Sequence, residues 1–326
     1  MTQTPSQILD RIWVLEMVRV TEAAAIAAAK LIGRGNEKAA DAAAVEAMRE
    51  ALNRLPFNGT VVIGEGERDE APMLYIGEKV GSDQDGPAID IALDPLEGTT
   101  ITAKAGANAM AVLAIAEAGH LLNAPDVYMD KLAIGPGYPE GLVDLDFSPA
   151  ENVRRFAEAK GVKPEDVMVC VLDRPRHEAL IRELREVGCG IKLIPDGDVA
   201  GVIAVTNPEE TTIDMYMGSG GAPEGVLAAA ALRCIGGQIQ GRLIFRNEDE
   251  KERARRVGIT DFNRKYKLEE LASGDVIFAA TGVTDGALLE GVKRKPGGWF
   301  TTESLVMRAS SGTVRYVYGE HRRKKL

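Results

Sequence analysis

The sequence predicts an α/β protein built from two lobes. The chain has 326 residues, more than the roughly 250–300 residues at which a single hydrophobic core stops growing. Its hydrophobic content of 45%, with only 5% aromatic residues, is typical of a globular protein. Strand and helix patterns alternate from about residue 166 onward, which indicates a second α/β lobe. We therefore expect one lobe over residues 1–160 and another over residues 161–326.

The first lobe is expected to begin with two helices. Apolar residues recur at helical spacing over residues 7–32, and Gly33 provides a stop. Asn36 can cap a second helix that extends to about Leu55. Asp41 lies on the apolar face of this second helix. Because burying an unpaired charge is costly, we expect a cation or a hydrogen-bond donor beside it.

Four apolar segments of the first lobe are expected to be strands, and two of them end in acidic sequences. The four segments are residues 60–63, 88–93, 108–116 and 131–134. The first is followed by Gly64-Glu65-Gly66 and the second by Asp94-Pro95. Loops at the C-terminal ends of strands form the usual ligand crevice of open α/β sheets. The sequence therefore places Glu65 and Asp94 at a candidate site.

Strands and helices follow one another closely in the second lobe. We expect strands at 167–172, 191–194 and 213–216, helices at 176–187 and 222–235, and a turn at the glycine-rich residues 218–221. Residues 246–256 are expected to form a solvated helix or surface loop. A strand at 276–280 and a hairpin around Ser310-Ser311-Gly312 are expected to complete this lobe.

Composition favours a metal-assisted reaction on an anionic substrate. The net charge of −10 argues against nucleic-acid binding, whereas a bound cation would reverse the local potential. Carboxylate oxygens suit Mg²⁺ or Mn²⁺, and three histidines are too few for a typical zinc site. The sequence has neither a signal-peptide pattern nor an apolar run that spans a bilayer. We therefore expect Mg²⁺ or Mn²⁺ as cofactor, a cytoplasmic location, and no nucleic-acid or membrane partner.

The densest candidate site is the segment Asp94-Pro95-Leu96-Glu97-Gly98-Thr99. Its two carboxylates supply anionic oxygens, its proline restricts the turn between them, and its glycine lets the backbone approach a ligand. Free amides of Thr99 and Thr100 at a helix start can bind phosphate oxygens. The structural alternative is an ordinary Asp-Pro turn before a capped helix.

Three polar segments of the second lobe are candidates for substrate binding. Arg174 and Arg176 can grip phosphate bidentately, or they can be ordinary surface arginines. Asp196-Gly197-Asp198 can accept hydrogen bonds from sugar hydroxyls, or it can form only a turn. Glu224, at the start of a helix, is either a metal ligand or an acid that is favourable in a first helical turn.

The chain resembles the class II fructose-1,6-bisphosphatases of bacteria, a branch of the lithium-sensitive phosphatase superfamily. The resemblance extends almost from end to end. The segments that carry it are residues 33–35, 62–81, 94–99, 123–126 with Tyr128, 174–177, 195–200 and 220–225. It implies a layered α/β/α/β/α sandwich, which agrees with the two lobes expected above.

The resemblance also implies roles for individual residues. The implied metal ligands are Asp41, Glu65, Asp94, Glu97 and Glu224. The implied substrate contacts are Glu97, Gly98, Thr99, Tyr128, Arg174, Pro175, Arg176, Asp196, Gly197, Asp198 and Gly221. Thr99, polarised by Glu67 or Asp69, is the candidate that orients or deprotonates the attacking water.

The implied reaction is hydrolysis of the 1-phosphate of fructose 1,6-bisphosphate, a step of gluconeogenesis, by a homodimer or homotetramer. Hydrolysis of sedoheptulose 1,7-bisphosphate, of both bisphosphates or of an inositol phosphate is one alternative. A non-hydrolytic regulator that binds sugar phosphates is another. Asn36-Glu37 stands where the better-known enterobacterial sequences have an acid and then a lysine, so no role for a lysine is carried over.

Overall fold

The computed structural model describes residue 9 and residues 12–66 and 73–322. The chain divides into two compact units, one made of residues 1–122 and 273–326 and the other of residues 123–272. The second unit is thus an insertion into the first. The chain leaves and re-enters the first unit at neighbouring points, because the Ser273 N–H donates to the His120 carbonyl at 2.9 Å. This division differs from the boundary expected at residue 160.

The first unit contains a mixed sheet. Its described strands are β1 (Asn58–Ile63), β2 (Lys79–Val80), β3 (Ala88–Glu97), β4 (Met110–Glu117), β11 (Val276–Gly282), β12 (Lys293–Lys295), β13 (Trp299–Arg308) and β14 (Thr313–Arg322). The strand order is β12-β13-β11-β4-β3-β1-β2, and β14 also pairs with β13. β1 and β3 are parallel, whereas β11 pairs with β4 in antiparallel register. The strand and hairpin expected to complete the second lobe therefore belong to this sheet.

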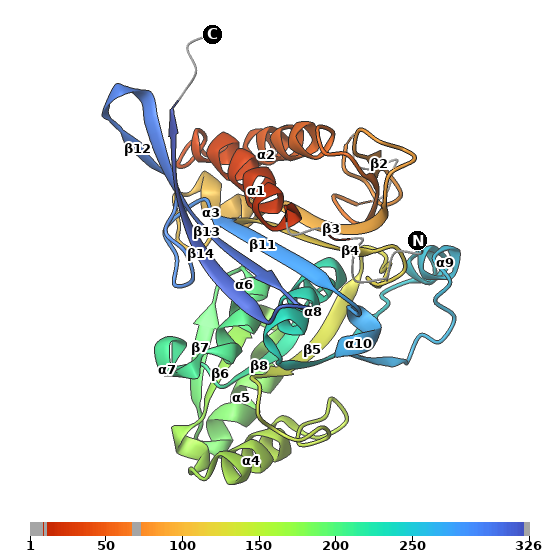
Figure 1. Cartoon of the computed structure of the whole chain (residues 1–326). Coiled ribbons are helices and arrows are strands. Elements are labelled where there is room, and N and C mark those ends of the chain that lie inside the picture. The colour runs from red at the N-terminus through yellow and green to blue at the C-terminus, as the bar shows by residue number, and fades with distance from the viewer. Residues whose placement is uncertain (1–8, 10–11, 67–72, 323–326) are drawn as a thin grey trace. The chain divides into compact units, whose positions relative to one another are not determined.

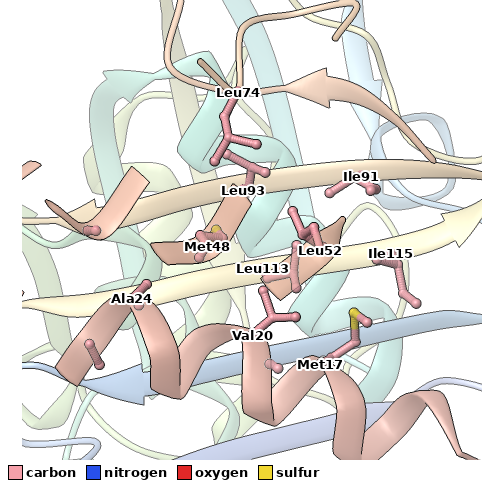
Figure 2. Close-up of a cluster of buried hydrophobic side chains, with 14 of the residues drawn as sticks. Met17, Val20, Ala24, Met48, Leu52, Leu74, Ile91, Leu93, Leu113 and Ile115 are labelled. Carbon is pink, nitrogen blue, oxygen red and sulfur yellow. The ribbon is translucent and has the colours of Figure 1, made fainter. Parts of the chain in front are cut away.

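Helices α1 (Trp13–Ala29) and α2 (Glu37–Leu52) lie side by side against this sheet (Figure 1). Figure 2 shows the core between them, where Met17 and Val20 of α1 and Met48 and Leu52 of α2 meet Leu113 of β4. All five side chains are buried. Burial of each large apolar side chain stabilises the fold by roughly 1.5–3 kcal/mol. A third helix, α3 (Thr99–Ala103), follows β3 directly.

The second unit contains a sheet of its own. Its described strands are β5 (Tyr128–Ile134), β6 (Met168–Leu172), β7 (Gly190–Ile194), β8 (Met215–Gly221), β9 (Gln238–Ile244) and β10 (Lys265–Lys267). The strand order is β10-β9-β5-β8-β6-β7. The strand expected at 131–134 in the first lobe is β5, and it lies between β8 and β9. Its apolar pattern predicts a strand correctly but carries no information about which sheet the strand joins.

Helices of two kinds accompany the second sheet. α4 (Pro149–Lys160) and α5 (Glu178–Val187) bury one apolar stripe each in a common core, whereas α8 (Ala222–Ile235) is buried along most of its length. The remaining short helices are α6 (Asp198–Ile203), α7 (Pro208–Thr211), α9 (Glu248–Arg256) and α10 (Leu268–Leu271). In the described ranges, no helix combines the length and apolar character needed to cross a membrane.

The turn expected at the glycine-rich residues 218–221 is not found. These residues are instead the last four of β8. They pair with β5 as far as Gly221 opposite Tyr128. A Cβ on Gly220 would lie 2.1 Å from Asp198 Oδ2. These glycines therefore leave room for buried side chains that approach the strand closely.

Candidate active site

The acidic segment Asp94 to Thr99 lies at the end of β3. The strand expected to stop at Leu93 continues to Glu97, and its register against β4 shifts between Asp94 and Glu97. Such a bulge accommodates a proline, which has no N–H to donate to the ladder. Asp94 Oδ1 accepts a hydrogen bond from the Leu96 N–H at 3.0 Å, and Glu97 is buried. The bulge therefore fixes how both carboxylates are presented.

Gly98 follows the bulge in a left-handed conformation, with φ 90° and ψ 51°, which favours glycine. The next helix, α3, is a single turn, so its dipole adds little to the phosphate binding expected at its start. Its last carbonyls accept hydrogen bonds from the preceding glycine turn, with Gly33 N–H to Thr102 O at 2.9 Å and Gly35 N–H to Ala103 O at 3.0 Å. The connection between α1 and α2 is thereby tied to the acidic segment.

Asp41 lies near the start of α2, which begins at the cap expected from the sequence. Asn36 Oδ1 accepts a hydrogen bond from the Ala39 N–H at 3.0 Å. Asp41 is half-buried, and burial raises the pKa of its carboxyl group. In the part of the chain that the structure describes, its carboxylate has no hydrogen bond or ion pair to offset this burial. A nearby cation would favour the charged form.

Glu65 follows β1 in a loop whose entry is held by backbone contacts. A Cβ on Gly64 would lie 2.1 Å from the Leu74 carbonyl oxygen, so only glycine fits there. The Glu65 N–H donates to that same oxygen at 3.0 Å, and the Ile76 N–H donates to the Gly66 carbonyl at 3.0 Å. The half-buried Glu65 is therefore placed by the loop backbone.

Four of the expected metal ligands, Asp41, Glu65, Asp94 and Glu97, belong to the first unit, and Glu224 belongs to the second. Among the residues that the structure describes, no three His, Cys, Asp or Glu side chains lie close enough to hold an ion. Glu67 and Asp69, expected to act with Thr99, lie outside the described ranges. The assignment of metal ligands from the sequence therefore stays a prediction.

Two of the expected substrate contacts meet in the second unit. Tyr128 opens β5 and pairs with Gly221 of β8 and with Ile244 of β9. The guanidinium carbon of Arg176 lies 4.9 Å from the centroid of the Tyr128 ring, a cation–π distance. Arg176 Nε and Nη2 donate to the Ser219 carbonyl at 3.0 and 2.7 Å. The guanidinium is therefore held in place by the protein.

Arg174 and Asp196 also lie near each other, at the ends of the parallel strands β6 and β7. Pro175 begins a 3-10 turn (Pro175–His177) after β6. Arg174 Nη2 lies 3.8 Å from Asp196 Oδ1, and both side chains are 39% exposed. An exposed pair of this kind contributes at most about 1 kcal/mol to stability. The Arg174 guanidinium thus remains accessible to an anion.

Asp198 occupies a different environment from Asp196. It starts α6 after Gly197, whose φ is 85°, and it is buried. Lys131 Nζ donates to Asp198 Oδ2 at 2.5 Å, and the Tyr216 hydroxyl lies 3.5 Å from the same oxygen. The Asp198 carboxylate is therefore already held by the protein interior.

Lys131 is a residue of this site that the sequence analysis missed. It is 1% exposed, and its neighbours on the same face of β5, Met129 and Ala133, are fully buried. A lysine in that register requires a buried partner. The alternation of residues in β5 was the available signal, but the partner, Asp198, comes from a distant part of the chain.

Glu224, in the first turn of α8, folds back onto Gly221. A Cβ on Gly221 would lie 1.9 Å from Glu224 Oε2, so a larger residue there would displace the Glu224 carboxylate. This oxygen is buried and has no hydrogen-bond partner within the described structure. Burial, followed by the negative charge of Asp198, raises the pKa of Glu224 to about 7, whereas Lys131 acts in the opposite direction. A buried oxygen without a donor fits a cation.

Comparison with known proteins identifies close relatives. A family model described as bacterial fructose-1,6-bisphosphatase, glpX-encoded, matches residues 11–321. Fructose-1,6-bisphosphatase 1 class 2 of Escherichia coli (strain K12) is 47% identical over 320 residues, which cover 94% of each chain. The class 2 protein of Shigella flexneri matches to the same extent. A solved structure of the extragenic suppressor protein suhB from Bartonella henselae aligns with 60% of this chain and 74% of its own at 15% identity, with a TM-score of 0.35. That score is too low to relate the two folds.

Proposed function

Because this chain belongs to the bacterial, glpX-encoded fructose-1,6-bisphosphatase family, we propose that it hydrolyses the 1-phosphate of D-fructose 1,6-bisphosphate. The products are fructose 6-phosphate and inorganic phosphate. The observation that carries this proposal is the 47% identity over 94% of both chains, together with a family-model match over residues 11–321 that spans both units. We further propose that the protein acts on this small sugar bisphosphate in the cytoplasm, as a homodimer or homotetramer.

Divalent cations, Mg²⁺ or Mn²⁺, are proposed as the cofactor. The proposed ligands are Asp41, Glu65, Asp94, Glu97 and Glu224. Two observations support the fit: burial raises the pKa of Asp41 without an offsetting partner in the described structure, and Glu224 Oε2 is buried without a donor there. A donor set made only of oxygens is the one that hard cations prefer. Bound cations would neutralise phosphate charge and lower the pKa of a water molecule.

The substrate contacts are proposed to lie in both units. They are Glu97, Gly98, Thr99, Tyr128, Arg174, Pro175, Arg176, Asp196, Gly197, Asp198 and Gly221. Arg176 is pre-oriented for phosphate, because the Ser219 carbonyl and the Tyr128 ring already hold its guanidinium. Asp198 is likewise fixed, by Lys131. Pre-oriented groups lose little side-chain entropy when the substrate binds.

The attacking water is proposed to be handled by Thr99. Its hydroxyl, polarised by Glu67 or Asp69, would orient or deprotonate that water. Thr99 is half-buried and follows Gly98, whose left-handed backbone starts α3. Thr99 is thus two residues from Glu97, the last residue of the strand that also carries Asp94, which supports a shared role.

Phosphate release from a panel of substrates tests this function. Purified protein with Mg²⁺ or Mn²⁺ should show a kcat/KM for fructose 1,6-bisphosphate well above that for inositol 1-phosphate. The kcat/KM for sedoheptulose 1,7-bisphosphate shows whether the site accepts a sugar with one more carbon. Chelation should abolish turnover, and either cation should restore it. Binding of fructose 1,6-bisphosphate without any phosphate release would instead indicate a non-hydrolytic sugar-phosphate-binding protein.

A further inference from the structure

Arg246 shares the Tyr128 ring with Arg176, although nothing in the sequence motifs points to it. Tyr128 pairs with Ile244, the last residue of β9, and Arg246 lies just beyond that strand. The guanidinium carbon of Arg246 is 5.1 Å from the centroid of the Tyr128 ring, compared with 4.9 Å for Arg176. One aromatic ring thus gathers two guanidinium groups that approach it from different elements of the second unit.

Arg246 is anchored on one side, as Arg176 is. Its Nε donates to Glu250 Oε1 at 2.6 Å, its Nη2 lies 2.5 Å from the same oxygen, and its backbone N–H donates to Glu250 Oε2 at 2.7 Å. Glu250 is 1% exposed, and Asn247 Oδ1 caps its helix by accepting the Glu250 N–H at 2.9 Å. The Arg246 guanidinium is therefore held by a buried carboxylate whose helix is capped.

The free edges of the two guanidinium groups can serve an anion. In the described structure, the hydrogen bonds of Arg176 and Arg246 use Nε and Nη2, and no bond to Nη1 of either residue is found. Both guanidinium groups lie at cation–π distance from the same ring, so an anion bound beside Tyr128 would be attracted by two positive charges. Glu250 offsets the charge of Arg246, whereas the hydrogen bonds of Arg176 within the described ranges are to the neutral carbonyl and hydroxyl of Ser219.

We propose that Arg246 is a specificity-determining residue. Together with Arg176 and Tyr128, it binds the second phosphate of the substrate, the one that the enzyme does not remove. This inference rests on the proposed function, in which the acidic loops act on the other phosphate. A planar guanidinium donates two parallel hydrogen bonds to phosphate oxygens, which gives geometric selectivity as well as charge. The side chain of Arg246 is 57% exposed, so its guanidinium is accessible to a ligand.

The chain offers a matched control for a purely structural arginine. Arg264 stacks on Tyr266 at 5.0 Å and pairs with Glu270 at 2.5 Å, so it makes the same two kinds of contact as Arg246, with a more exposed carboxylate. No second arginine is found on the Tyr266 ring in the described part of the chain. Replacing Arg264 therefore measures the stability lost when a cation–π stack and an exposed ion pair are broken, while Arg246, Arg176 and Tyr128 stay unchanged.

The test compares Arg246→Ala, Arg246→Lys and Arg264→Ala on substrates with and without the second phosphate. Arg246→Ala should raise the KM for fructose 1,6-bisphosphate about ten- to a hundredfold, the range for a lost hydrogen bond to a charged group, with kcat little changed. For fructose 1-phosphate its KM should equal that of the parent protein. Arg246→Lys should fall in between, and Arg264→Ala should change neither constant.

Calorimetric binding of fructose 6-phosphate provides a readout that does not depend on turnover. Weaker binding by Arg246→Ala than by Arg264→Ala, measured below the unfolding temperature of each variant, supports the inference. Unchanged binding, or an equal rise in KM for both substrates, overturns it. If the parent protein binds fructose 6-phosphate but hydrolyses no bisphosphate, the proposed function fails, and the effect of Arg246→Ala on this binding still decides the inference.

Discussion

Asp94→Asn is expected to lower kcat for fructose 1,6-bisphosphate by at least about a thousandfold, because loss of a carboxylate ligand removes several kcal/mol of charge stabilisation. The substitution keeps the size of the side chain. Its amide oxygen can still accept the Leu96 N–H that Asp94 Oδ1 binds at 3.0 Å, so the bulge of β3 should survive. Steady-state kinetics with saturating Mn²⁺ or Mg²⁺, together with calorimetric Mn²⁺ binding, measures the effect.

Asp90 of the same strand provides a control for this substitution. Its carboxylate is buried, and Oδ2 accepts the Gly119 N–H at 2.7 Å, so its role is structural. Asp90→Asn should lower the thermal unfolding temperature but leave kcat within a few-fold of the parent. If Asp94→Asn kept more than a tenth of the parent's kcat and bound Mn²⁺ normally, Asp94 would not be a metal ligand.

Lys131→Met is expected to destabilise the protein by about 3–5 kcal/mol, the usual cost of removing one partner of a buried ion pair. The methionine fills a similar space, but Asp198 is left as a buried carboxylate whose Oδ2 has lost the ammonium at 2.5 Å. Glu224 also loses the positive charge that opposes its raised pKa. Urea unfolding at pH 7, followed by circular dichroism, measures the change.

Two further variants separate burial from charge. Lys265→Met removes an ammonium that contacts Asp144 and Asp146 near the surface of the same unit, and it should cost no more than about 1 kcal/mol. The double variant Lys131→Met/Asp198→Leu should recover part of the lost stability, because no unpaired carboxylate stays buried. If Lys131→Met and Lys265→Met lowered the free energy of unfolding equally, the Lys131–Asp198 pair would contribute no more than an exposed ion pair, and the prediction would be wrong.

Local patterns predicted the elements well. The cap at Asn36, the strand before Asp94 and the helix from Ala222 all depend on residues within a few positions of each other. Membership in a sheet depends on pairing between distant segments, so β5 and β11 were each placed in the wrong lobe. Periodicity describes one segment at a time and says nothing about its neighbours.

The residues of the candidate site also differ in whether local sequence is enough to predict them. Residues in contiguous motifs, such as Glu65 and Asp94, could be named from the sequence because glycines and a proline mark their loops. Lys131 could not, because its burial is explained only by Asp198, which is distant in the chain. Arg246 was expected only as part of a solvated stretch, since its contact with Tyr128 depends on the pairing of β5 with β9.

The insertion of one unit into the other has a consequence for the order in which the chain folds during synthesis. β4 gains its neighbour β11 only after residues 276–282 have been made, and these follow the whole of the inserted unit. Until then, the edge of β4 and the apolar face of α1 lack partners from β11 and β13. Such unpaired edges are prone to aggregation. A nascent chain arrested after residue 272 would therefore contain one complete unit and one that still exposes an unpaired strand edge.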